Sequence, residues 1–210
     1  MLRFSSTVTS NAADVDSVAA SQTPGGAGNL TLTASTVTFG SSAAQKVTAT
    51  SASNISNRTL TITGTNVYGG ALVEAITGPN ANTVTTTGYF KSITQVAISG
   101  AAAGALSVGN AADTEGTMYV GDSDSNPFQV GLGCVIASGT PTFTVQHTFD
   151  NVIATGFNYN TSTWFNHSVI AAKTTNQDGN YNFPVQAIKL ILTAAGSVTM
   201  TLLQAGGGWR

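Results

Sequence analysis

Short runs in which apolar and hydroxyl-bearing residues alternate are the feature that most restricts the fold of this chain. Leu60 and Ile62 alternate with Thr in "RTLTITGT", and Val198, Met200 and Leu202 do so in "SVTMTLLQ". A period of two places successive apolar side chains on one face of a strand. Gly-, Asn- and Pro-rich turns such as "TGPNANT" separate the runs at roughly 8–12-residue spacing, as in antiparallel sandwiches and barrels. The sequence therefore predicts an all-β protein.

Changes in composition divide the 210 residues into three parts. The first part is rich in Ser, Ala and Thr and ends in "QTPGGAG", which predicts an extended arm that precedes the first regular strand. The polar stretch "GNAADTEG", residues 109–116, is interpreted as a linker, and aromatic residues are denser after it. We expect two antiparallel β-sandwich domains, Ig-like or jelly-roll-like, with these bounds: an arm at 1–27, a first sandwich at 28–112, and a second sandwich at 113–210 with a Gly-rich C-terminal tip.

The segment "VQAIKLILTAAG" allows two interpretations. Ile188, Leu190 and Leu192 lie at a period of two, as do the apolar residues after Gly196, which favours a β-hairpin; a helix is the alternative. At the chain end, the tip formed by Trp209 and Arg210 could insert into a partner or fray.

Charge is unusually scarce. Only 8% of the residues are Asp, Glu, Lys or Arg, against roughly 25% in typical soluble domains, and the net charge is −2. Neutral hydroxyl and amide surfaces are cheaper to desolvate than charges, so they suit a protein covered by neighbours in an assembly. The basic residues are scattered, which argues against nucleic-acid binding. They are Arg3, Lys46, Arg58, Lys91, Lys173, Lys189 and Arg210.

Cysteine and targeting signals are also sparse. Cys134 is the single cysteine, so we expect no internal disulfide and a small buried apolar side chain at this position, as in a reducing cytosol. The first 18 residues lack the apolar core of a secretory signal, and no apolar run approaches the roughly 20 residues of a membrane span. We therefore expect no membrane partner.

One loop has the spacing of a cation site. In "DSDSNPF", Asp122, Asp124 and Asn126 occupy alternate positions, as calcium ligands do. Pro127 and Gly133 stand where the EF-hand pattern requires Gly and Glu. A polar interstrand loop is the favoured interpretation, and adventitious calcium is the alternative.

The two histidines do not indicate an active site. His147 and Asp150 could be combined with one of many serines into a triad, but no nucleophile motif accompanies them. His147 and His167 lack the clustered carboxylates or cysteines of a metal site. We expect a protein that is not an enzyme, with no catalytic, cofactor-binding or metal-binding residues and no cofactor.

Several other side chains are candidates for contacts. Tyr159, Trp164 and Phe165 could form a platform for carbohydrate, although a core or interface role is favoured. Glu74 and Lys91 are the only charges between Gly64 and Gly100, and we expect them to pair across strands or to face a neighbouring molecule.

The order of motifs resembles a known group. "TITGTN", "EAITGPN" and "YFKSIT", followed by "VQHTFD" and "DGNYNFPVQAIKL", are similar to two-domain β-sandwich virion structural proteins of tailed bacteriophages, and the similarity extends over nearly the whole chain. Members of that group have no known catalytic residues.

This resemblance implies a place in a virus particle assembled in the host cytoplasm. The leading hypothesis is a capsid decoration or cement protein that binds the outside of the head and stabilises the shell. The alternative is a tail, neck or fibre component, and a carbohydrate-binding module is a third hypothesis. The expected partners are the major capsid protein or other virion proteins and further copies of the chain, a trimer being plausible.

Overall fold

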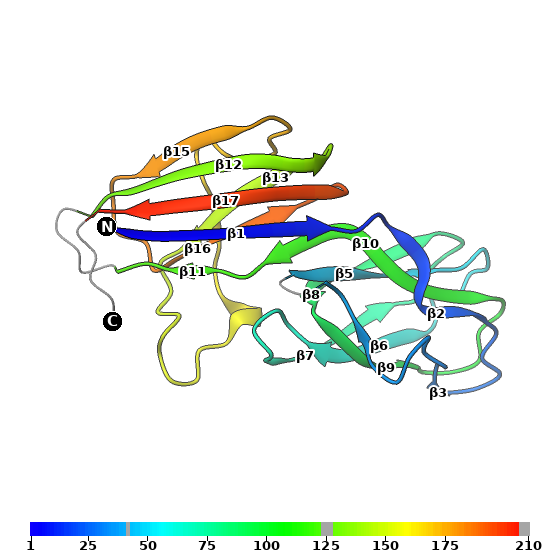
Figure 1. Cartoon of the computed structure of the whole chain (residues 1–210). Coiled ribbons are helices and arrows are strands. Elements are labelled where there is room, and N and C mark those ends of the chain that lie inside the picture. Colours follow the sequence, from blue (N-terminus) through cyan, green and yellow to red (C-terminus); the bar gives the residue numbers. More distant parts are fainter. Residues whose placement is uncertain (41–42, 123–127, 206–210) are drawn as a thin grey trace. The chain divides into compact units, whose positions relative to one another are not determined.

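The computed structural model describes residues 1–40, 43–122 and 128–205 and confirms the all-β prediction (Figure 1). Among these residues, the regular elements are strands apart from one 3-10 turn, Tyr159–Thr161. Contacts divide the chain into two compact units, which we call the N-terminal unit (Ala12–Thr114) and the C-terminal unit (Met1–Asn11 together with Glu115–Arg210).

The N-terminal unit is built from two groups of hydrogen-bonded strands. The first group runs in the order β2, β10, β5, β8, and the second has β9 and β6 at its centre with β7 beside β6 and the short β3 and β4 beside β9. The strand bounds are β2 Asp14–Gln22, β3 Gly28–Asn29, β4 Val37–Thr38, β5 Ala43–Thr50, β6 Thr59–Thr65, β7 Ala71–Thr77, β8 Thr83–Phe90, β9 Ser92–Ile98 and β10 Leu106–Gly116.

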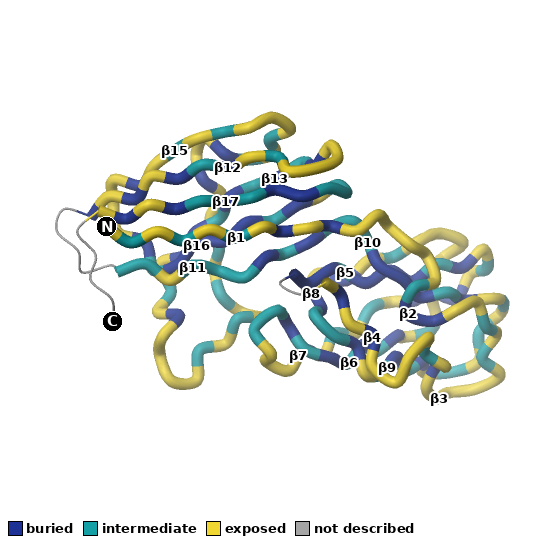
Figure 2. Tube along the Cα trace, viewed as in Figure 1, coloured by how far each residue is buried: buried dark blue, intermediate teal, exposed yellow. Residues whose placement is uncertain are grey.

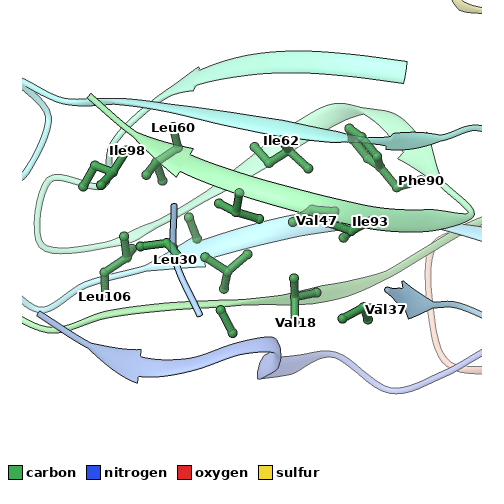
Figure 3. Close-up of a cluster of buried hydrophobic side chains, with 14 of the residues drawn as sticks. Val18, Leu30, Val37, Val47, Leu60, Ile62, Phe90, Ile93, Ile98 and Leu106 are labelled. Carbon is green, nitrogen blue, oxygen red and sulfur yellow. The ribbon is translucent and has the colours of Figure 1, made fainter. Parts of the chain in front are cut away.

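The core of this unit lies between the two groups of strands (Figure 3). Leu60 and Ile62 of β6 point toward the facing layer, where Val47 of β5 and Leu106 of β10 lie. All four side chains are buried because the period-two alternation directs them to one face of their strands.

The C-terminal unit also has two groups of strands. One is a sheet in the order β1, β17, β12, β15, and the other has the order β14, β13, β16, with β11 beside β16. Exposed and covered residues alternate along β1, as Figure 2 shows. The bounds are β1 Leu2–Ser10, β11 Tyr119–Val120, β12 Val130–Gly139, β13 Phe143–Thr148, β14 Phe165–Asn166, β15 Gln177–Tyr181, β16 Ala187–Leu192 and β17 Gly196–Gln204.

The predicted arm at 1–27 is largely two paired strands. β1 pairs with β17 over nine residues without interruption, and β2 pairs with β10. The sequence did not indicate β1 because hydroxyl residues occupy most of its positions, and only Leu2, Phe4 and Val8 are apolar on its inner face. The contact division also falls inside the predicted arm, between Asn11 and Ala12.

The predicted linker at 109–116 is wrong, since these residues belong to the strand β10. Its polar side chains are compatible with burial because they are hydrogen-bonded. The amide nitrogen of Asn110 donates to the Ala12 carbonyl at 3.0 Å, and the Ser17 hydroxyl donates to Asn110 Oδ1 at 2.7 Å. The contact division lies between Thr114 and Glu115, two residues beyond the predicted boundary.

The segment 185–204 forms strands, as predicted, and not a helix, but the predicted hairpin pairing is wrong. β16 pairs with β13 and β11, whereas β17 pairs with β1 and β12. The chain therefore crosses between sheets at the turn before Gly196. A period of two fixes which face of a strand is buried but does not choose the strand's neighbour.

Candidate interaction surface

Six rings from three segments gather in the C-terminal unit, and we call them the aromatic cluster. β13 and the residue after its end contribute His147 and Phe149, β14 and the residue after it contribute Phe165 and His167, and β15 with the loop after it contributes Tyr181 and Phe183. The pairing of β13 with β14 sets His147 opposite Phe165.

His147 lies at the centre of this cluster. The distances from its ring centroid are 5.4 Å to Phe149, 5.9 Å to Phe165, 5.1 Å to Tyr181 and 5.9 Å to Phe183. These separations are typical of favourable aromatic pairs. The imidazole is buried, while 52% of Phe149, 48% of Phe165 and 47% of Phe183 is exposed. Three phenylalanines therefore present a nearly contiguous apolar surface above a buried histidine.

The environment of His147 favours its neutral form. Burial among aromatic rings lowers the pKa of His147 below its ordinary value of 6.5, and the nearby His167 lowers it further. The Nδ1 atom lies 3.3 Å from the Tyr181 hydroxyl, whose own pKa is raised by burial and by Cys134. The cluster consequently presents apolar rings without a charged group at its centre.

His167 has a structural role in the same cluster. Its Nδ1 accepts hydrogen bonds from the backbone N–H groups of Val169 and Ile170, both at 3.1 Å. Nδ1 therefore carries no proton, so Nε2–H donates to the carbonyl oxygen of Asn180 at 3.2 Å. A side chain at Gly179 would place its Cβ 2.9 Å from the His167 ring. These contacts tie the segment after β14 to β15 and hold Phe165 and Tyr181 in place.

The hypothetical catalytic set is not assembled in this geometry. The Asp150 carboxylate accepts the backbone N–H of Thr163 at 2.7 Å, whereas His147 faces Tyr181. Within the described part of the chain, no three His, Cys, Asp or Glu side chains are grouped to hold a metal ion. Most of the loop 122–128, interpreted as a polar interstrand loop with adventitious calcium as the alternative, lies outside the described residues, as do Trp209 and Arg210.

The three residues of the hypothetical carbohydrate platform have different surroundings. The Lys189 ammonium lies 4.0 Å from the centroid of the Trp164 ring and 3.0 Å from a Glu115 oxygen. Burial lowers the pKa of Lys189, and the nearby Glu115 carboxylate opposes this shift. Tyr159 packs against Phe157 at 5.0 Å, and its hydroxyl contacts the sulfur of Met118. Phe165 alone belongs to the aromatic cluster. One face of Trp164 is thus occupied by a cation and is not open for stacking on a sugar.

The surroundings of Cys134, Glu74 and Lys91 can be compared with the expectations from the sequence. Cys134 is buried, as predicted, and burial raises the pKa of its thiol to about 12. Glu74 and Lys91 do not pair with each other, since each binds the backbone of its own unit, and the alternative that they face a neighbouring molecule stays a prediction. The Glu74 carboxylate accepts N–H groups of Thr87 and Gly88 at 2.6 and 2.8 Å, and the Lys91 ammonium donates to two carbonyl oxygens of residues 39 and 40.

The aromatic cluster was missed by the sequence interpretation. A local signal exists, because aromatic residues and histidines recur at the ends of three strands in "QHTF", "WFNH" and "NYNF". Their convergence depends on β14 and β15 flanking different sheets, which no local pattern reveals.

Comparison with known proteins gives no family for this chain: it matches no protein-family model, and no curated protein is significantly similar to it. Among the described residues, no helix has the length and apolar character needed to cross a membrane.

Proposed function

We propose that the chain is a structural component of a tailed-bacteriophage particle, a capsid decoration protein that binds the outside of the head and stabilises the shell. The observation that carries this proposal is the aromatic cluster, an exposed apolar surface on a chain with very few charges. Exposed apolar patches rimmed by polar residues mark interaction sites. The motif resemblance to phage virion proteins supplies the kind of partner, which is the major capsid protein.

The cluster has the properties of an interface centre. Phe149, Phe165 and Phe183 all pack against the buried His147, and Phe183 also packs against Tyr181, so little side-chain entropy is lost when a partner covers them. Aromatic anchors in such settings dominate binding energy, whereas polar rims contribute less. Stabilisation of a shell then follows from many copies of a modest interface, each of which spans neighbouring subunits.

Rebinding to particles prepared without the protein tests this proposal. Phe149→Ser, Phe165→Ser and Phe183→Ser should each weaken binding at least about tenfold, because each removes an anchor from the apolar centre. Val135→Ser is the matched control, since Val135 of β12 is 53% exposed and takes no part in the cluster. Thermal unfolding of each variant verifies that the fold is retained.

Two results would reject the proposal. The first is full-strength rebinding of the folded Phe variants, which would remove the cluster from the interface. The second is an absence of binding by the unaltered protein to any shell. Binding only at the tail, neck or fibres would favour the alternative location, for which the same surface would serve with a different symmetry.

A further inference from the structure

The strand β1 lies at the edge of its sheet. Its partner is β17, and among the described strands none pairs with its other side. The nine-residue pairing with β17 is regular and has no bulge, so the backbone groups of alternate residues point away from the sheet along the open side. An open strand of this length is a template for another strand.

Several protections that are common at natural sheet edges are absent from β1. They include Lys or Pro on the strand, bulges, inward-pointing charges and a very short strand. β1 contains no Lys or Pro, and its single charge, Arg3, is on the outer, exposed face at one end. The open side of β1 is therefore available for pairing with another strand.

We propose that β1 pairs with β1 of a second copy of this chain, antiparallel and with Ser6 on the two-fold axis. In this register Phe4 lies opposite Val8 on the inner face, and Ser5 lies opposite Thr7 on the outer face. Arg3 meets Thr9, so the two arginines are separated by about 20 Å at ~3.4 Å per residue. The pairing is isologous and closes at two copies. It is independent of the proposed place in a virus particle.

Side-chain chemistry selects this register over its neighbours. A shift by one residue would set inward side chains against outward ones, because side chains alternate along a strand. A shift of one β1 strand by two residues along the other places Phe4 opposite a serine and shortens the paired length of the two strands. With Ser6 on the axis, the strands overlap fully and each half-exposed Phe4 gains an apolar neighbour.

The outer face already contains the hydrogen-bonding pattern that the second copy would extend. Ser5 bonds to the Thr201 hydroxyl at 3.2 Å, Thr7 to the Thr199 hydroxyl at 2.8 Å, and Thr9 to the Ser197 hydroxyl at 2.9 Å. A hydroxyl group has one donor and two acceptor positions, so each can bond to a neighbour on both sides. The hydroxyl ladder between β17 and β1 can thus continue into the second copy.

Cysteine cross-linking of the isolated full-length protein tests the pairing and its register. An oxidised mixture of Ser5→Cys and Thr7→Cys proteins should form a disulfide-linked dimer, because these positions face each other. Either variant alone should not, since identical positions are offset by two residues and their Cα atoms lie beyond the roughly 7 Å limit for a disulfide. The wild-type protein is the background control, because Cys134 is buried.

Light scattering supplies a second measurement. The wild-type protein should have twice the chain mass, and the Ser5→Lys/Thr7→Lys variant should have the mass of one chain, because four ammonium groups would meet at the axis. Ser5→Thr/Thr7→Ser retains the hydroxyls and should remain dimeric. A wild-type mass of one chain, or cross-linking of Ser5→Cys alone or Thr7→Cys alone, would overturn the proposal.

Discussion

At the scale of single residues, the few ionisable groups of this chain are mainly structural. His167 accepts two backbone N–H groups, and Glu74 also accepts two. Lys189 lies between Glu115 and the Trp164 ring. His167 and Glu74 satisfy backbone N–H groups that loops or strand ends would otherwise leave without a partner. Lys189 instead joins two side chains.

His147 should make stability depend on pH. Its pKa is lowered in the folded protein, so the unfolded chain binds the proton more readily below about 6.5. The contribution to stability is therefore complete above the unfolded value and is lost as pH falls through and below it. Chemical denaturation at neutral and mildly acidic pH should show this decrease in the wild-type protein.

The comparison variant is His147→Gln, which retains a hydrogen-bond acceptor for Tyr181 but does not titrate in this range. Its free energy of unfolding should fall less than that of the wild-type protein between neutral and acidic pH. An equal fall in the two proteins would contradict the assignment of the effect to His147.

At the scale of elements, strand order depends on places where the chain changes sheets. β8 and β9 are separated by Lys91 alone, yet β8 pairs with β5 and β9 pairs with β6. Phe90 and Ile93 are both buried although they are three residues apart, because the chain turns a corner between them. The alternation of apolar and polar residues in "YFKSITQVAIS" is imperfect because the chain passes from β8 to β9 within this segment.

Gly64 is required by the close pairing of β6 with β9. The register shifts between Thr63 and Gly64, and an added Cβ would lie 1.8 Å from the Ser92 carbonyl oxygen. Gly64→Ala should therefore lower the free energy of unfolding by about 3 kcal/mol or more, because the backbone at Ser92 must move to admit the methyl group. Gly133→Ala on β12 is the control, as open space surrounds its Cβ position and its effect should lie within about 0.5 kcal/mol. Similar midpoints of denaturation for the two variants would contradict this role for Gly64.

The sequence predicted where strands occur better than it predicted which strands pair. Period-two runs located β6, β12, β13, β16 and β17, since alternate apolar side chains of each are buried. They failed for β15, whose "QDGNY" is polar at a sheet edge, and for "NLTLTAS", most of which lies outside strands although Leu30 is buried. Pairing between distant segments, such as β1 with β17, depends on tertiary packing that local alternation does not encode.

At the scale of the whole molecule, each unit is a layered β-structure whose described charges are largely bonded within the unit. Lys46 lies 3.9 Å from Asp113, and Arg58 Nε donates to the Ala101 carbonyl at 2.8 Å. With so few remaining charges, we expect the proposed partner to be recognised through shape, aromatic contacts and neutral hydrogen bonds. A particle component held by many neighbours fits these properties.

A density map of the intact phage particle, with the copies of this chain counted, tests the central proposal most directly. We predict on the order of hundreds of copies on the outside of the head, as expected for a component that follows shell symmetry. Phe149, Phe165 and Phe183 should lie against the major capsid protein. About six or twelve copies confined to the neck or tail, or head-bound copies whose aromatic cluster faces solvent, would contradict this proposal.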